Sequence, residues 1–81
     1  MHRDLKLGNL LLNHNLDTKI ADFGLAVRLE SEEERRKTIC GTPNYIAPEI
    51  IAKGTSGHSY PADIWSFGVL IFQMLVGHAP F

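Results

Sequence analysis

The stretch from Pro61 to about Val76 restricts the fold of this chain more than any other. Pro61-Ala62-Asp63 is typical of a first helical turn and Gly77 of the residue after a helix, so we expect a central helix at about residues 61–77. Apolar side chains cover nearly all its faces: Ile64, Trp65, Phe67, Val69, Leu70, Ile71, Phe72, Met74, Leu75 and Val76. Such a helix belongs in the middle of a protein, and 81 residues are too few to surround it. We therefore expect the chain to be part of something larger.

The charge and composition argue against several classes of protein. The formal net charge is -1, which gives no electrostatic attraction to nucleic acid or to a membrane surface. The apolar run from Ile64 to Val76 is shorter than the roughly 20 residues that a membrane-spanning helix needs. A single cysteine, Cys40, can form no internal disulfide, which favours a reducing compartment. We expect no nucleic-acid partner, no membrane partner and an intracellular location.

Two short apolar runs in the first half of the chain predict a β-hairpin. They are Leu10–Leu12 and Lys19–Ala21, and the residues between them, 13–17, are rich in turn formers. From Gly24 to about Tyr45 the sequence is typical of a long exposed loop, which in a compact domain is usually functional or disordered. The charged block 30–37 within it is expected to be a solvated face.

A short helix is expected between the long loop and the central helix. It begins at Ala47-Pro48-Glu49, because proline suits a first helical turn, and it ends at about Lys53. The glycines of Gly54-Thr55-Ser56-Gly57 then break it. With the hairpin, these elements make the fold class α+β.

Three motifs follow one another along the chain. His2-Arg3-Asp4-Leu5-Lys6-Leu7-Gly8-Asn9 fits the pattern H-R-D-L-x-x-x-N at every fixed position, Asp22-Phe23-Gly24 follows the hairpin, and Ala47-Pro48-Glu49 follows the long loop. One tripeptide alone is a weak signal, but three in this order and context are a strong one. Over its whole length the chain resembles the catalytic domain of eukaryotic-type serine/threonine protein kinases.

The resemblance implies where the chain lies in that domain. It would form part of the mainly helical C-terminal lobe of the kinase fold. The catalytic loop would be residues 1–9, the hairpin with its D-F-G motif 10–24, the activation segment 22–49, and the central helix 61–77. The expected activity is ATP-dependent phosphorylation of serine and threonine hydroxyls on protein substrates, with Mg²⁺ as the metal.

The family's catalytic roles carry over to matching positions. Asp4 would accept the proton of the substrate hydroxyl, and Lys6 would place its ammonium near the transferred phosphate. Asn9 and Asp22 offer the hard oxygen ligands that Mg²⁺ prefers, and the hairpin would bring them together. Leu11 would pack beneath the adenine ring.

Two further features resemble serine/threonine-specific kinases. One is the lysine at position 6, and the other is Gly41-Thr42-Pro43-Asn44-Tyr45. Thr42 would hydrogen-bond the catalytic aspartate and lysine beneath the substrate hydroxyl.

Arg3, next to the catalytic aspartate, implies control by phosphorylation. In such kinases this arginine grips a phosphate on the activation loop through a bidentate contact. Thr38 is the expected acceptor, phosphorylated by an upstream kinase, and Arg28 is a second candidate contact. Ser31 is a lesser candidate because its acidic neighbours would repel the added charge.

The remaining assignments are structural. His2 and Phe23 resemble a stacked pair, Asp63 the aspartate that holds the catalytic loop, and Glu49 a glutamate whose arginine partner is not in this chain. Cys40 is expected to be buried or half-buried. The histidines His14, His58 and His78 lie in turn-like stretches without ligand spacing, and Trp65 and the phenylalanines are expected in the core.

Within the superfamily, Lys6-Leu7-Gly8-Asn9 and residues 37–49 resemble the polo-like branch, for which cytoplasm, nucleus and centrosome are the implied locations. No Gly-rich loop and no V-A-I-K lysine are present, so the fragment by itself is expected to be inactive. Two alternatives therefore stay open. The chain could be a truncated, non-catalytic polypeptide for binding or regulation, or a gene fragment without independent function.

Overall fold

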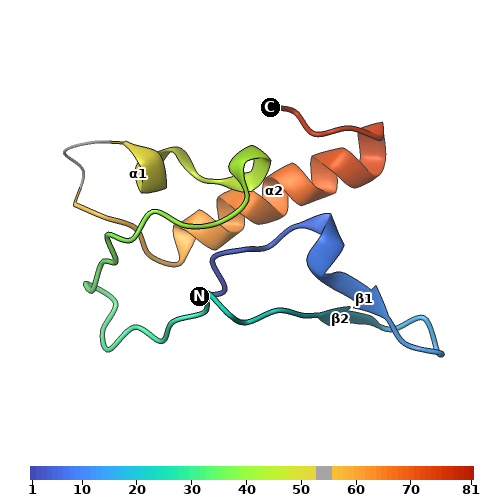
Figure 1. Ribbon diagram of the computed structural model, residues 1–81, viewed down its shortest axis with the longest axis horizontal. Coiled ribbons are helices and arrows are strands. Elements are labelled where there is room, and N and C mark those ends of the chain that lie inside the picture. The colour runs from blue at the N-terminus through green and yellow to red at the C-terminus, as the bar shows by residue number, and fades with distance from the viewer. Residues whose placement is uncertain (53–55) are drawn as a thin grey trace.

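The computed structural model describes residues 1–52 and 56–81. Its elements, in order, are η1 (Leu7–Asn9), β1 (Leu10–Leu12), β2 (Thr18–Ile20), η2 (Pro43–Tyr45), α1 (Pro48–Ile51) and α2 (Pro61–Val76). Helix α2 runs through the middle of the molecule, the hairpin projects toward one end, and the long loop that follows β2 lies toward the other (Figure 1). Among the helices of these residues, none combines the length and hydropathy that crossing a bilayer requires.

The hairpin prediction is confirmed. Strands β1 and β2 pair antiparallel, with Leu10 opposite Ile20 and Leu12 opposite Thr18, so β2 begins one residue earlier than expected. The turn is closed by Asn13, whose Oδ1 accepts the N–H groups of Asn15 and Asp17, each at 2.9 Å. This is the local side-chain bonding that makes asparagine a turn former.

Helix α2 has the predicted bounds. It begins with proline at its first position and ends at Val76. Gly77 follows with φ 95°, in the left-handed region, and its N–H donates to the Gln73 carbonyl at 2.9 Å. Its buried residues, Ala62, Ser66, Val69 and Leu70, are spaced three or four apart, apart from the last adjacent pair, and so form one stripe.

Two small apolar clusters lie along this stripe. One contains Tyr45, Val69 and Leu70, and the other contains Ala47, Ile50 and Ala62. A buried hydrogen bond links α2 to η2. In it, Ser66 Oγ donates to the Tyr45 carbonyl at 2.8 Å. Tyr45 Oη also hydrogen-bonds Gln73 Oε1. Segment 42–50, with η2 and α1, is thereby fixed along one side of α2.

The other faces of α2 are largely exposed, in line with the expectation that this chain is too short to surround the helix, whereas the core positions expected for Trp65 and the phenylalanines are wrong. Ile64 is 69% exposed and Leu75 82% exposed, and Trp65, Phe67 and Phe72 are exposed as well. The phenylalanines outside α2, Phe23 and Phe81, are also exposed rather than in the core. The physical reason is that segment 42–50 covers only one stripe of a helix that is apolar on all its faces.

Helix α1 is shorter than predicted. It ends at Ile51, because Ala52 has extended backbone with φ -69° and ψ 129°. The expected end at Lys53 lies outside the described residues, as do Gly54 and Thr55 of the expected break.

The isolated 81-residue chain is expected to lack a cooperative thermal transition and to enhance the fluorescence of a hydrophobic dye such as ANS. Two clusters of three residues bury too little apolar surface to offset the entropy of ordering the chain, while most of α2 faces solvent. Heating followed by circular dichroism, with dye binding at low temperature, measures both properties. A single sharp transition without dye binding would contradict the prediction.

Candidate active site

The carboxylate of Asp63, in the first turn of α2, holds the start of the chain. Its Oδ2 accepts the His2 N–H at 2.7 Å, and its Oδ1 accepts the Arg3 N–H at 2.9 Å. Arg3 has φ 73°, a conformation that costs about 1–3 kcal/mol for a residue with a side chain. Two charge-assisted hydrogen bonds are strong enough to offset that cost. The contact expected of Asp63 is therefore present.

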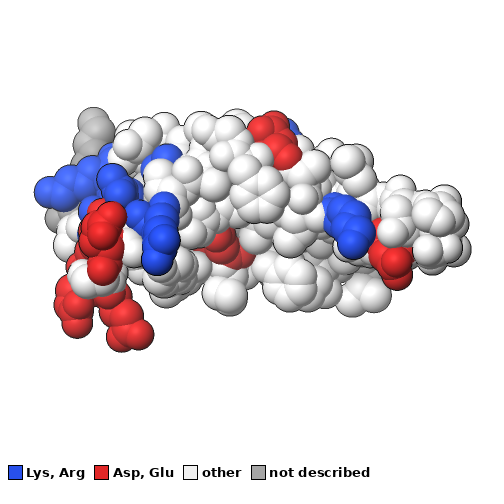
Figure 2. Space-filling model, turned by 90° about the horizontal axis from the view of Figure 1, so that it is seen from below, with Lys and Arg blue, Asp and Glu red and all other residues white. Residues whose placement is uncertain are grey.

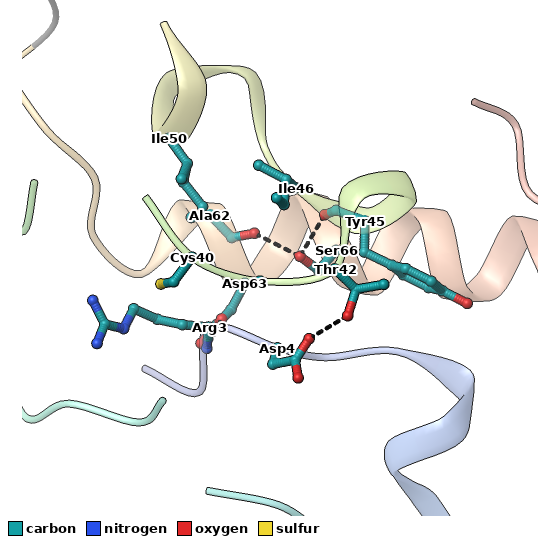
Figure 3. A pocket seen from close by; sticks show the side chains of 11 residues that line it. Arg3, Asp4, Cys40, Thr42, Tyr45, Ile46, Ile50, Ala62, Asp63 and Ser66 are labelled. Atoms are coloured by element: carbon teal, nitrogen blue, oxygen red, sulfur yellow. Dashed lines mark hydrogen bonds between the residues drawn. The ribbon is translucent and has the colours of Figure 1, made fainter. Parts of the chain in front are cut away.

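The Asp4 carboxyl lies next to this anchored turn, and its side chain is 14% exposed. Thr42 Oγ1 donates to Asp4 Oδ1 at 2.7 Å, as Figure 3 shows. Asn9 Nδ2 donates to the Asp4 carbonyl at 2.9 Å and approaches Oδ2 at 3.5 Å. Lys6 Nζ is 3.9 Å from the same Oδ2. The structure thus brings together all four predicted catalytic residues: Asp4, Lys6, Asn9 and Thr42.

A glycine makes it possible for the segment around Thr42 to approach the start of the chain. Gly41 has φ +113°, and a Cβ built there would lie 3.0 Å from the Arg3 carbonyl oxygen. Such a contact is tighter than most Cβ contacts, and the positive φ strains any other residue, so glycine at position 41 helps Thr42 to reach Asp4. Cys40, half-buried as expected, lines a small cavity between residues 3–4, segment 40–50 and α2.

The two predicted Mg²⁺ ligands come from the two ends of the hairpin. The Ala21 N–H donates to the Asn9 carbonyl at 2.8 Å, which continues the strand pairing and places Asp22 directly beyond it. Asn9 is buried and its Nδ2 donates to Asp4, while its Oδ1 accepts no hydrogen bond within the described residues and is the atom that could bind a metal. Asp22 is exposed, with one carboxylate oxygen bonded to the Gly24 N–H at 3.2 Å. These oxygen donors fit Mg²⁺, although no cluster of three His, Cys, Asp or Glu side chains occurs in the described residues.

Leu11 and Phe23 complete the surface near the hairpin. Leu11 is exposed on β1, opposite Lys19. Phe23 contacts His2 with 4.8 Å between ring centroids and an interplanar angle of 68°, so the expected pair meets edge to face rather than stacked. His2 is fixed by a 2.9 Å hydrogen bond between its Nε2 and the Ala21 carbonyl.

In the described part of the chain, the predicted regulatory residues Arg3 and Thr38 form no hydrogen bond with each other. Arg3 Nε donates to the Leu25 carbonyl at 2.7 Å, and its Nη1 is buried with no hydrogen-bond partner among the described residues. Thr38 is exposed, and within the described part of the chain its hydroxyl makes no hydrogen bond. The side chain of Arg28 is exposed. Its backbone carbonyl accepts a hydrogen bond from Arg36 Nη2 at 3.3 Å.

The charged block 30–37 is only partly the solvated face that we expected. Charged side chains gather at the end of the molecule where this block lies (Figure 2). Arg36, however, is half-buried and forms an ion pair with Glu34 at 2.9 Å. Its backbone pairs with that of His58, which is 2% exposed. Sequence reasoning missed His58, and no local pattern distinguishes it from the exposed His14 and His78.

His58 has a perturbed pKa. Burial lowers its pKa below the usual 6.5, and the positive charge of Arg3 lowers it further. The carboxylates of Glu49 and Asp63 act in the opposite direction without reversing the shift. The neutral imidazole is therefore the form that the fold favours.

Comparison with known proteins identifies the family. The protein kinase domain family matches residues 1–81, so the chain belongs to that family. The probable serine/threonine-protein kinase CCRP1 of Zea mays is 64% identical over 81 residues, which are 100% of this chain and 13% of that protein. The serine/threonine-protein kinase polo of Drosophila melanogaster is 63% identical over the whole chain, which covers 14% of it.

A third relative supports the same branch. The cell cycle serine/threonine-protein kinase CDC5/MSD2 of Saccharomyces cerevisiae is 57% identical over 100% of this chain and 12% of its own length. The resemblance to serine/threonine kinases, with polo among the relatives, is thereby confirmed. The chain spans only between 12% and 14% of the length of these three relatives.

A kinase domain that carries this chain is expected to lose stability as the pH falls below about 6.5. The unfolded chain binds the His58 proton more tightly than the folded chain, so the contribution of neutral His58 is present above that pH and is lost below it. Urea unfolding at pH 7.5 and 5.5 measures the change. His58→Gln, which does not titrate, should flatten the dependence.

The exposed His14 supplies the control. His14→Gln should leave the pH dependence of the unfolding free energy as it is in the parent domain. Equal slopes for the parent and His58→Gln would show that His58 does not contribute.

Proposed function

We propose that this chain works as part of the C-terminal lobe of a complete kinase domain, in the ATP-dependent phosphorylation of serine and threonine hydroxyls on protein substrates. The observation that carries the proposal is the Asp4 carboxyl, which receives the Thr42 hydroxyl on one oxygen and has Lys6 near the other. Asp4 directly follows His2 and Arg3, whose N–H groups are held by the Asp63 carboxylate. A carboxylate fixed in this way is suited to accept a proton from a bound hydroxyl.

Thr42 and Lys6 have separate tasks in this proposal. Because Thr42 occupies Oδ1, the substrate hydroxyl would donate to Oδ2 of Asp4. Lys6 carries a positive charge 3.9 Å from that oxygen, where it would stabilise negative charge that develops as the phosphoryl group moves. The side chain of Asn9 holds the Asp4 backbone and keeps the loop in register.

The cofactors of this proposal are ATP and Mg²⁺. The residues that would hold the metal are Asn9, through Oδ1, and Asp22, through its carboxylate. The exposed face of Leu11 would support the adenine ring. When bound, Mg²⁺ would supply positive charge that offsets the negative charge of the phosphates.

Regulation at Thr38 is part of the same proposal. The Nη1 group of Arg3 is a buried donor without a partner in the described residues, which is an arrangement that an incoming anion would stabilise. A phosphate on exposed Thr38, added by an upstream kinase, has the charge and the oxygen acceptors for that role. Arg28 would be the second basic contact.

The division of the chain follows from these assignments. We assign residues 1–9 to the catalytic loop, 10–24 to the hairpin and D-F-G motif, 22–49 to the activation segment and 61–77 to the central helix. The protein would act inside the cell, in the cytoplasm, the nucleus or at the centrosome. The joined set of Asp4, Asn9 and Thr42 favours catalysis over a role in binding alone.

Asp4→Asn is expected to reduce phosphotransfer by about a hundredfold or more, because the amide cannot accept the substrate proton. The test uses the kinase domain of Drosophila polo in which the matching segment is replaced by these 81 residues. Transfer of labelled phosphate from ATP to a protein substrate is measured. Asp17→Asn, in the hairpin turn, is the matched control and should leave the rate unchanged.

Labelling by Asp4→Asn at the parent rate would overturn the assignment of Asp4. An inactive parent chimera that is folded, with binding of ATP retained, would overturn the proposed function of the segment.

Thr38→Ala is expected to lower the activity of the phosphorylated chimera several-fold, and Thr38→Asp to restore part of it, because only the second variant gives Arg3 an anionic partner. Initial rates after treatment with an activating kinase measure both effects. Ser31→Ala serves as the control from the same loop. Equal activity of both Thr38 variants and the parent would remove Thr38 from the mechanism.

A further inference from the structure

The activation segment is tied to the chain that leads into α2 by a pair of backbone hydrogen bonds. The Arg36 N–H donates to the His58 carbonyl, and the His58 N–H donates to the Arg36 carbonyl, each at 2.8 Å. Reciprocal bonds of this kind form one rung of an antiparallel ladder. We call this rung, residues 35–36 with residues 57–58, the loop clamp.

Gly57 is required by the geometry of the loop clamp. Its φ is +98°, and a Cβ built on it would lie 2.6 Å from the Arg36 carbonyl oxygen and 3.1 Å from the Arg35 Cβ. The first distance is far inside a normal contact, and the atom it meets is backbone, which cannot swing aside. The two segments of the loop clamp, residues 35–36 and 57–58, therefore approach more closely than any side chain at position 57 would allow.

Side chains from both segments of the loop clamp are partly or fully buried around it. His58 is 2% exposed, and the half-buried Arg36 is held by Glu34 at 2.9 Å and by the Arg28 carbonyl at 3.3 Å. Backbone bonds that are covered in this way exchange slowly with solvent, in contrast to the bonds of an exposed loop.

The loop clamp is directly connected to the anchor of the catalytic loop. After His58 the chain enters the first turn of α2 through two overlapping hydrogen bonds. The Ala62 N–H donates to the Ser59 carbonyl and the Asp63 N–H donates to the Tyr60 carbonyl, each at 3.0 Å. Asp63 then binds the catalytic loop.

We propose that Gly57 and His58 are positioning residues, which anchor the activation segment two residues before Thr38 to the stretch of chain that fixes the catalytic loop. This inference deepens the proposed kinase function and rests on it for its catalytic consequence. The loop clamp sets where Thr38 can lie relative to Arg3. The segment that binds a protein substrate would then depend on a backbone contact outside the motifs.

The first test uses the unaltered kinase chimera and residue-resolved amide hydrogen exchange. The amides of Arg36 and His58 should exchange at least about tenfold more slowly than those of Glu32 and Glu33, which lie in the same exposed loop. Equal exchange at the four amides would overturn the loop clamp.

The second test compares Gly57→Ala with Gly77→Ala. Both residues have positive φ, at +98° and +95°, but a Cβ at Gly77 would meet nothing within 4 Å. Both variants should lose stability, whereas only Gly57→Ala should raise exchange at Arg36, by about tenfold or more, and speed tryptic cleavage after Arg35 and Arg36. Gly57→Ala should also raise the KM for a protein substrate and leave the KM for ATP unchanged.

The outcomes separate the inference from the proposed function. Identical exchange and cleavage in the two variants would overturn the inference even if the chimera is active. A chimera that does not transfer phosphate but protects Arg36 and His58 would overturn the proposed function and leave the loop clamp standing. If Gly57→Ala does not fold, the exchange pattern of the unaltered chimera decides the question.

Discussion

Two hydrogen bonds from backbone N–H groups to the Asp63 carboxylate determine most of the geometry of the site. They hold His2 and Arg3 at the start of α2 and keep Arg3 in the left-handed region of backbone space. Since Asp4 follows directly, the direction of its side chain is set by the same contact. A helix is a rigid support, so an aspartate in its first turn positions a loop better than another loop could.

The second support is segment 42–50, which reaches the same helix by a different route. Ser66 bonds the Tyr45 carbonyl, and Gly41 lets the chain pass close to Arg3, so the Thr42 hydroxyl meets Asp4. The site is therefore built where two segments from different parts of the sequence both rest on α2. The positive charge next to Asp4 comes from Lys6, whose Nζ lies 3.9 Å from Asp4 Oδ2.

Much of this arrangement could be predicted from the sequence, partly from local turn and helix signals and partly from the roles that the resemblance to kinases implies for motif residues. The hairpin and the bounds of α2 are examples of the first kind, and the contacts of Asp63 and of Thr42 with Asp4 are examples of the second. His58 could not be predicted, since its burial results from pairing with a distant segment and not from local composition. The core positions expected for Trp65 and the phenylalanines were wrong, because an apolar residue shows what the chain can bury and not what covers it.

The most direct test of this account is to measure the turnover number of the Asp63→Asn variant of the kinase chimera. The Ser66→Ala variant is measured beside it as a control. Asparagine offers one acceptor oxygen and no charge, so His2 or Arg3 loses its partner, while Ser66→Ala breaks a buried bond of the same helix without touching the loop. We expect Asp63→Asn to lower kcat by about a hundredfold in a protein that stays folded, and Ser66→Ala to lower stability with little effect on kcat. A folded Asp63→Asn variant with the parent kcat would contradict the account.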